Sequence, residues 1–384
     1  MCRERRPSHP LRSAAVLSPL DDYPIHQAAL SMRHVVPSDR NFYDRYYFNC
    51  HGSSDELFLV AGMGQYPNLG VQDAFVLVQH DDQHRVVRAS RELGDNRMDT
   101  TVGPIRVEVI EPLQRHRVIL EPNEWGIEAD LTWEGSIPAH GEPQHFQRAP
   151  HGRVMFDTMR LAQTGCWTGR IGIDGTEIEV TPDRWWGSRD RSWGVRPVGE
   201  PEPPGISATG AMDGFWWLYA PMQFEDFSIL CICQEEPDGR RVLEQATRVW
   251  ADPTRPPEAL GRPEIDLRFR SGTRDVVGAT WHLQTADREP LDVEVEVRLP
   301  MHVGIGTGYG FGADWRHGMW QGPLVVQGVS WDLRDPVVAA QMFGIVDTVA
   351  RFTCEGQVGY GLFEFLLLGR HDPSGFAGWE DVAP

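Results

Sequence analysis

Hydrophobic and polar residues alternate along most of this chain with the period of two that a half-buried β-strand requires. In the clearest run, 291–299, leucine or valine occupies every odd position and Asp, Glu or Arg every even one. Residues 105–109 alternate in the same way. Further strands are predicted at 57–61, 74–79, 84–90, 116–120, 126–134, 166–173, 176–180, 215–219, 227–233, 241–249, 265–270, 276–284, 324–333, 342–354 and 358–368. Helical periodicity is scarce, so the pattern predicts an almost all-β protein.

Turn signals separate the predicted strands. Asp174-Gly175 and Asp238-Gly239 are dipeptides typical of two-residue hairpin turns. The chain of 384 residues holds 39 glycines and 29 prolines, which suits many short strands joined by turns. Together these features favour a β-sandwich or a β-barrel.

Two segments lying 153 residues apart are similar. Residues 165–175 (GCWTGRIGIDG) and 318–328 (GMWQGPLVVQG) share three glycines, one tryptophan and two aliphatic positions. A fixed offset of this kind indicates an internal repeat. We therefore predict two halves related by internal duplication, in which Trp167 superposes on Trp320.

A proline-rich stretch, 199–205 (GEPEPPG), lies between the two similar segments and cannot be a central strand. It predicts a linker at 198–210. The first barrel domain is then expected at 40–197 and the second at 211–384. Residues 1–39 are expected to form an irregular N-terminal segment.

Composition and charge argue against several functions. A hydrophobic content of 41% with 24% charged residues is that of a globular protein, and a net charge of −19 opposes binding to nucleic acid or anionic lipid. The six cysteines form no CxxC pair and are expected to be reduced and buried. No uncharged apolar run approaches the ~20 residues of a membrane span. The basic N-terminus lacks the apolar core of a secretion signal, so the expected compartment is the cytoplasm.

The segment 183–196 is unusually rich in aromatic and charged residues. It holds three tryptophans (Trp185, Trp186 and Trp193), four arginines and two aspartates in fourteen positions. As a structural element, its tryptophans would close a barrel end or a domain contact while Asp190 bonds the arginines beside it. As a site, the same aromatics would line an apolar cavity with Asp190 as its ionisable group. The sequence leaves both interpretations open.

Residues 189–194 (RDRSWG) of this segment resemble the junction motif of two-domain, lipocalin-like (calycin) proteins. That superfamily includes carotenoid 1,2-hydratases and Diels–Alderase-type cyclases, and this chain is most similar to its uncharacterised bacterial members. The resemblance also takes in 308–312 (GYGFG), 315–320 (WRHGMW) and 359–364 (GYGLFE), and spans roughly 40–375. It implies two tandem lipocalin-like antiparallel β-barrels. The resemblance does not assign an activity, because proteins with one fold catalyse many different reactions.

Two further side chains could transfer protons. His317 lies among glycines and aromatics and could act as acid or base near neutral pH, or it could simply hydrogen-bond a loop. Glu364 is a carboxylate within an apolar run, on the face opposite Phe363 and Phe365. If that face lines a barrel interior, burial raises the pKa of Glu364 and makes it a proton donor. An arginine partner would make it structural.

The leading interpretation is an apolar cavity that binds a small lipophilic molecule, such as an isoprenoid, a steroid or a polyketide. Its walls are predicted to include Trp185, Trp186, Trp193, Tyr309, Trp315 and Trp320. Cofactor-free hydration of a double bond, isomerisation or cyclisation would then use Glu364, Asp190 and His317. The alternative is a non-catalytic carrier of the same ligands, and filled barrels without a cavity would indicate a structural module.

No cofactor or metal is expected. His140, His145 and His151 lie in a loop rich in proline and glycine, without the spacing of a zinc site. The glycine-rich stretch 304–310 is followed by neither a helix nor a Lys-Ser/Thr pair, so it is not a phosphate-binding loop.

Overall fold

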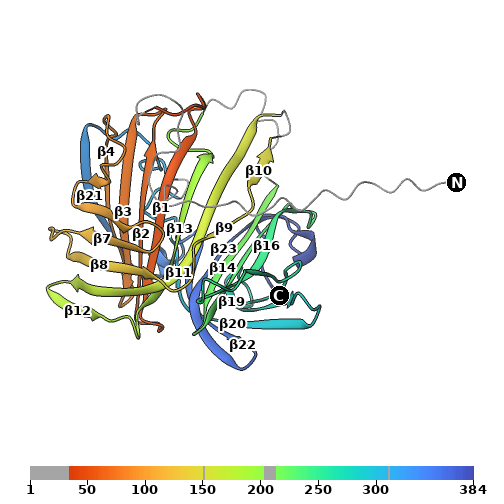
Figure 1. Cartoon of the computed structure of the whole chain (residues 1–384). Helices are drawn as coiled ribbons and strands as arrows, with labels where there is room; N and C mark the ends of the chain where they lie inside the picture. The colour runs from red at the N-terminus through yellow and green to blue at the C-terminus, as the bar shows by residue number, and fades with distance from the viewer. Residues whose placement is uncertain (1–33, 150–151, 203–212, 310–311) are drawn as a thin grey trace.

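The computed structural model describes residues 34–149, 152–202, 213–309 and 312–384. Its strands form two antiparallel sheets that lie side by side, one almost closed into a barrel and the other a half-barrel (Figure 1). The predicted fold class, an all-β protein of two tandem lipocalin-like antiparallel barrels, is confirmed. Parts of the predicted N-terminal segment, linker and 308–312 motif, and all of His151, lie outside the described residues.

The first sheet has fourteen strands. Most belong to the first half of the chain: β1 (Phe42–His51), β2 (Leu57–Tyr66), β3 (Val71–His80), β4 (Gln83–Glu92), β5 (Thr101–Val102), β6 (Ile105–Glu111), β7 (Arg115–Leu120), β8 (Ile127–Gly135), β9 (His140–Gly141), β10 (His145–Arg148), β11 (Val154–Ile173), β12 (Thr176–Val180) and β13 (Trp186–Val195). The last, β21 (Leu324–Asp332), comes from the second half and pairs with β4, with Val329 opposite Val86. The main path runs β21-β4-β3-β2-β1-β13-β11-β8-β7-β6-β5.

The second sheet has nine strands, in the order β17-β16-β15-β14-β23-β22-β20-β19-β18. They are β14 (Gly214–Gln223), β15 (Phe227–Glu235), β16 (Arg241–Trp250), β17 (Glu258–Ala259), β18 (Glu264–Phe269), β19 (Val276–Gln284), β20 (Pro290–Met301), β22 (Val346–Cys354) and β23 (Gln357–Gly369). Helix α1 (Pro336–Ala339) and the 3₁₀ turn η3 (Asp372–Ser374) are short. Within the described ranges, no helix has the length and apolar character needed to cross a membrane.

The two sheets repeat one strand order, although not in the predicted sequence register. In the first sheet β1 begins a run of four hairpin strands and pairs with β13, and in the second β14 begins a run of three long ones and pairs with β23. Trp167 lies buried in β11, whereas Trp320 lies between β20 and β21 and is 48% exposed. The predicted superposition of these two tryptophans is therefore wrong, because the match between 165–175 and 318–328 aligns a strand with a connecting segment. Internal duplication stays a prediction.

Two central strands, β1 and β13, were not predicted from the alternation pattern. Tyr46 of β1 enters the core of the first barrel, whereas its neighbour Tyr47 faces the second sheet. A strand that is buried on both faces has no polar face to alternate with an apolar one. In β13 both faces also pack against other parts of the protein, with Gly187–Arg189 and Arg191 buried and the rest half-buried, so the segment 183–196 shows no clear polar face.

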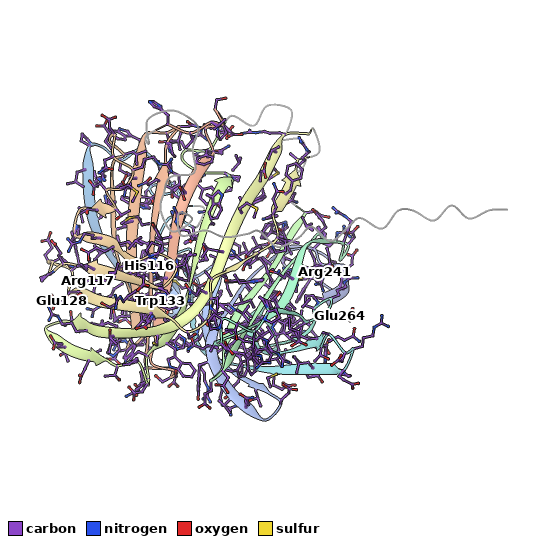
Figure 2. The ribbon with its side chains drawn as sticks, in the orientation of Figure 1. His116, Arg117, Glu128, Trp133, Arg241 and Glu264 are labelled. Atoms are coloured by element: carbon purple, nitrogen blue, oxygen red, sulfur yellow. The ribbon has the colours of Figure 1, made fainter. Side chains whose placement is uncertain are left out.

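Among the described residues, three large apolar clusters and one small one hold the fold together. The first fills the barrel around Trp133 and Trp167, and the second fills the half-barrel around Trp281. Figure 2 shows Trp133 on the side of the first barrel. The third lies between the sheets and includes Tyr47 from the first sheet and Tyr219 from the second. This third layer positions the candidate site.

Candidate functional site

A cluster of polar side chains lies between the two sheets, where β13 and β11 contact β23 and β14. On the first sheet, Asp190 stands between Tyr47 and Ala162 of the neighbouring strands. On the second, Glu364 stands between Tyr219 and Asp347. Because directly opposed residues share one face of a sheet, both rows point into the layer between the sheets. This interface cluster comprises Tyr47, Glu142, Arg160, Asp190, Trp217, Tyr219, Asp347 and Glu364.

Asp347 and Glu364 form a pair of carboxyl groups that hydrogen-bond each other. The fully buried Asp347 side chain also accepts a hydrogen bond from Tyr47, with 2.5 Å between Oη and Oδ2. Burial and then the neighbouring Glu364 charge raise the pKa of Asp347 well above its ordinary value. Two buried carboxylates in contact do not both ionise, so the pair holds one proton near neutral pH.

Glu364 is the second member of the carboxyl pair. The Trp217 indole donates a hydrogen bond to it, with 2.5 Å between Nε1 and Oε1. Burial raises the pKa of Glu364, whereas the Trp217 bond and the Arg160 charge oppose the rise. The side chain lies on the face of β23 that carries Leu362, as the alternation pattern predicts. That face looks onto the first sheet and not into a barrel.

Asp190 is a half-buried carboxylate that interacts with most of the cluster. Burial raises its pKa, and four guanidinium groups oppose this, those of Arg160, Arg196, Arg45 and Arg189. Its own charge raises the pKa of several neighbours: Glu142, Tyr219, Tyr309 and Asp347. Within the described ranges no hydrogen bond holds its carboxylate. Strand alternation explains this, because Arg189 and Arg191 lie on the opposite face of β13.

Arg160 and Tyr219 bring two unpartnered donors into the cluster. Arg160 Nε donates to the buried Glu142 Oε2 at 2.5 Å, and the guanidinium carbon lies 4.1 Å from the centre of the Tyr219 ring. Arg160 Nη2 and Tyr219 Oη are buried without a hydrogen-bond partner among the described residues. Unpaired buried donors are rare in folded proteins and mark places where a ligand or water binds.

Residues 17–377 match a family described as a family of unknown function, DUF8625. The chain belongs to this family. No curated protein matches its sequence.

Three solved structures are similar to this DUF8625 member. A Nitrosomonas europaea protein assigned as AttH is similar over 86% of this chain and 94% of its own, with a TM-score of 0.51 and 12% identity. Kievitone hydratase from Nectria haematococca covers 90% of this chain and 98% of its own (TM-score 0.42, 11% identity). CghA covers 91% and 96% (TM-score 0.48, 12% identity). The first similarity shows the fold alone, and at that level it confirms the resemblance to two-domain lipocalin-like proteins.

In the DUF8625 chain, His317 follows β20 and precedes β21, and its ring contacts Tyr309 at 4.3 Å between centroids. Its Nδ1 accepts a hydrogen bond from Arg196 Nη2 at 3.2 Å, and its ring stacks on Phe75 with 6.2 Å between centroids. Burial, followed by the charges of Arg45 and Arg196, lowers the pKa of His317 well below its ordinary value. A ring that stays neutral at physiological pH suits an anchor for this connecting segment better than a proton donor.

The predicted aromatic ligand-binding residues are dispersed, and the electrostatic contacts of Tyr309 reach the cluster. Burial raises the pKa of Tyr309 to about 12, and the Asp190 and Glu364 charges add to the rise. Trp186 lies at the contact between the sheets, edge-on to Tyr360 of β23.

Four other predicted aromatics lie elsewhere. Trp185 belongs to the core of the first barrel. Trp193 is half-buried on β13, opposite Asp44 of β1. Trp315 is buried beside the Arg88 guanidinium at 4.5 Å, and Trp320 is largely exposed. The dense aromatic segment is thus divided between the barrel core and the contact between the sheets.

Six residues of the interface cluster were not identified from the sequence: Tyr47, Glu142, Arg160, Trp217, Tyr219 and Asp347. Tyr219 lies in a predicted strand, where an aromatic is ordinary core composition. Asp347 could have been predicted from the sequence. It is an acidic residue next to the apolar Val346 in a predicted strand, just as Glu364 is next to Phe363. Glu142 lies in an irregular proline-containing stretch that gives no signal.

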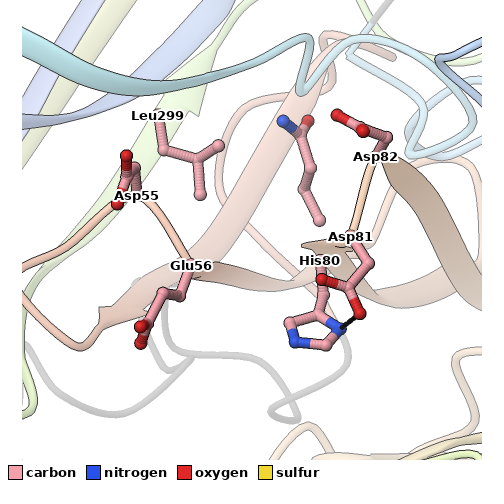
Figure 3. A pocket seen from close by; sticks show the side chains of 7 residues that line it. Asp55, Glu56, His80, Asp81, Asp82 and Leu299 are labelled. Carbon is pink, nitrogen blue, oxygen red and sulfur yellow. Dashed lines mark ion pairs between the residues drawn. The ribbon is translucent and has the colours of Figure 1, made fainter.

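A cleft of about 500 Å³ lies away from the cluster and is lined by Asp55, Glu56, Gln79, His80, Asp81, Asp82 and Leu299 (Figure 3). Its acidic residues are exposed, and His80 Nδ1 lies 3.4 Å from Asp81 Oδ2. None of the predicted site residues lines it. Across the described part of the chain, no group of three or more His, Cys, Asp or Glu side chains could hold a metal ion.

Proposed function

We propose that the chain binds a small lipophilic molecule in the layer between its two sheets and transfers a proton to or from it without a cofactor. The observation that carries this proposal is the Asp347–Glu364 carboxyl pair, in which Asp347 is fully buried, Glu364 is half-buried, and the raised pKa of Asp347 favours one bound proton. A carboxyl group that keeps its proton at neutral pH is a general acid, and its ionised partner is a general base. Hydration, isomerisation and cyclisation of double bonds all need such transfers.

The surroundings of the pair support proton transfer. The Tyr47 hydroxyl fixes the orientation of Asp347, and the Trp217 indole fixes that of Glu364. Asp190 adds a carboxylate whose side chain is not held by a hydrogen bond, and it can stabilise positive charge that develops on a protonated alkene. We assign proton transfer to Glu364 and Asp347, electrostatic support to Asp190 and positioning to His317.

The apolar part of the same layer supports a lipophilic ligand. Residues that pack there include Phe58, Leu230 and Leu362, with Trp217 and Tyr309 at its margin. Binding sites for small lipophilic molecules combine such walls with a few placed polar groups. The similarity to the fold of the AttH protein is compatible with this but does not decide it.

The test is native mass spectrometry of the wild-type protein and of Glu364→Gln, both expressed in the natural host. The substitution is nearly isosteric and cannot donate a carboxylic proton. We expect a lipophile to co-purify with both proteins, with the wild type carrying product and Glu364→Gln carrying substrate. For a hydratase the two ligands differ by the mass of one water, and for an isomerase or cyclase they differ in chromatographic retention.

The matched control is Asp183→Asn, which changes an exposed aspartate in the loop before β13 and should carry the wild-type ligand. The same molecule on wild type and Glu364→Gln would indicate a carrier. Absence of any lipophile from all three proteins would refute the proposed binding.

A further inference from the structure

The two unpartnered donors of the interface cluster lie on residues in contact. Tyr219 is 2% exposed, and the Arg160 guanidinium lies over its ring at 4.1 Å. Arg160 uses Nε for Glu142, which leaves Nη2 without an acceptor. Tyr219 Oη has no partner either. Burial and nearby carboxylates raise the pKa of Tyr219 well above its ordinary value, so its hydroxyl keeps its proton and remains a donor.

Two buried donors on residues in contact, each without an acceptor, call for an oxygen on the ligand. The charges around them define what kind of oxygen fits. Glu142 and Asp190 are carboxylates close to Arg160, and the Asp347–Glu364 pair carries one further negative charge. Three carboxylates act on Tyr219, those of Glu142, Asp190 and Glu364, against the one positive charge of Arg160, and they would repel an anionic ligand group. A neutral acceptor, of which a carbonyl oxygen is the strongest common type, would not be repelled.

We propose that Tyr219 and Arg160 bind the carbonyl oxygen of the substrate, which makes the substrate class lipophilic ketones and enones and not plain hydrocarbons. This inference rests on the proposed function and narrows its substrate.

With a carbonyl bound at these donors, the carboxyl pair can catalyse a proton transfer. The ionised carboxylate of the pair takes a proton from the carbon next to the carbonyl, and the electron pair of that C–H bond forms a carbon–carbon double bond. The carbonyl oxygen takes up the negative charge, which Tyr219 Oη and Arg160 Nη2 stabilise. When the substrate is an enone, return of the proton to the far carbon of the conjugated enolate restores the carbonyl and moves the carbon–carbon double bond, which completes an isomerisation. No oxidant or reductant is needed.

The test uses two probes that differ at one position: chalcone, which is an aryl enone, and 1,3-diphenylpropene, which lacks the carbonyl oxygen. Each is titrated into wild type, Tyr219→Phe and Tyr360→Phe, and binding is followed by quenching of tryptophan fluorescence. Tyr360→Phe is the matched control, because it removes the hydroxyl of a half-buried tyrosine outside the cluster.

We expect wild type and Tyr360→Phe to bind chalcone about tenfold more tightly than 1,3-diphenylpropene, the effect of roughly one good hydrogen bond. Tyr219→Phe should remove this preference and leave hydrocarbon binding unchanged. Its melting temperature should equal or exceed that of wild type, because the lost hydroxyl has no partner.

Equal binding of both probes to wild type and Tyr219→Phe would overturn the carbonyl assignment while leaving the proposed function in place. Binding of neither probe to any of the proteins would count against both.

Discussion

Asp44→Asn is expected to lower the free energy of unfolding by about 3–5 kcal/mol, the largest stability effect of any substitution considered for this chain. Asp44 lies inside the first barrel between two arginines, with 3.0 Å from its Oδ2 to Arg97 Nη2 and an ion pair to Arg191. All three side chains are 0% exposed. Asparagine keeps the shape but leaves two buried guanidinium groups without a counter-charge.

Urea unfolding followed by tryptophan fluorescence measures this loss. Asp183→Asn is the control, since its exposed carboxylate should contribute almost nothing. Equal urea midpoints for Asp44→Asn and wild type would contradict this prediction. They would mean that the two arginines need no counter-charge and that the buried ion pairs do not stabilise the fold.

Asp347→Asn is expected to have the opposite effect and to stabilise the protein above pH 7, by on the order of 1 kcal/mol. Asp347 is as deeply buried as Asp44, but its neighbour is the carboxyl group of Glu364 and not an arginine. Asparagine at 347 can still accept a hydrogen bond from Tyr47. Its amide can donate a hydrogen bond to Glu364, and it carries no acidic proton that is lost as the pH rises. The same chemical change therefore has opposite signs at two buried aspartates.

The pH dependence follows from the raised pKa of Asp347. Its carboxyl group holds a proton in the folded state at pH values where the unfolded chain has lost it, so the stability it contributes is complete below about pH 4 and falls as the pH rises. The advantage of Asp347→Asn should thus be small near pH 4 and grow toward pH 8. Thermal melts of both proteins across this range measure it. An advantage that is constant or shrinks with rising pH would contradict the raised pKa.

The outer strands were predictable from the sequence, because one of their faces meets solvent. The run 291–299 became β20, where the acids of the exposed face still alternate with buried valines. β1 and β13 gave no such signal, since β1 is buried on both faces and β13 is buried or half-buried on both. The segment before β21 gave a wrong prediction for another reason. Its tryptophan, Trp320, and its glycines belong to a connection between strands and not to a second copy of β11.

The candidate site could be predicted only in part. Glu364 and Asp190 were identified because each is an acid in apolar or aromatic sequence. Their partners could not be, because Tyr47 and Asp347 are brought together from opposite ends of the chain by packing of the two sheets. Periodicity indicates which face of a strand is buried, but not which other sheet lies against that face.

One proton shared by Asp347 and Glu364 at neutral pH is the feature on which the proposed chemistry depends, and infrared spectroscopy detects it directly. A protonated carboxyl group has a carbonyl stretching band that an ionised carboxylate lacks. We predict that the wild-type protein shows this band near neutral pH and that Asp347→Asn loses it, whereas Glu364→Gln shifts it, because burial still holds the proton on Asp347. A wild-type spectrum without the band, or a band that survives in both variants, would contradict a shared proton at this pair.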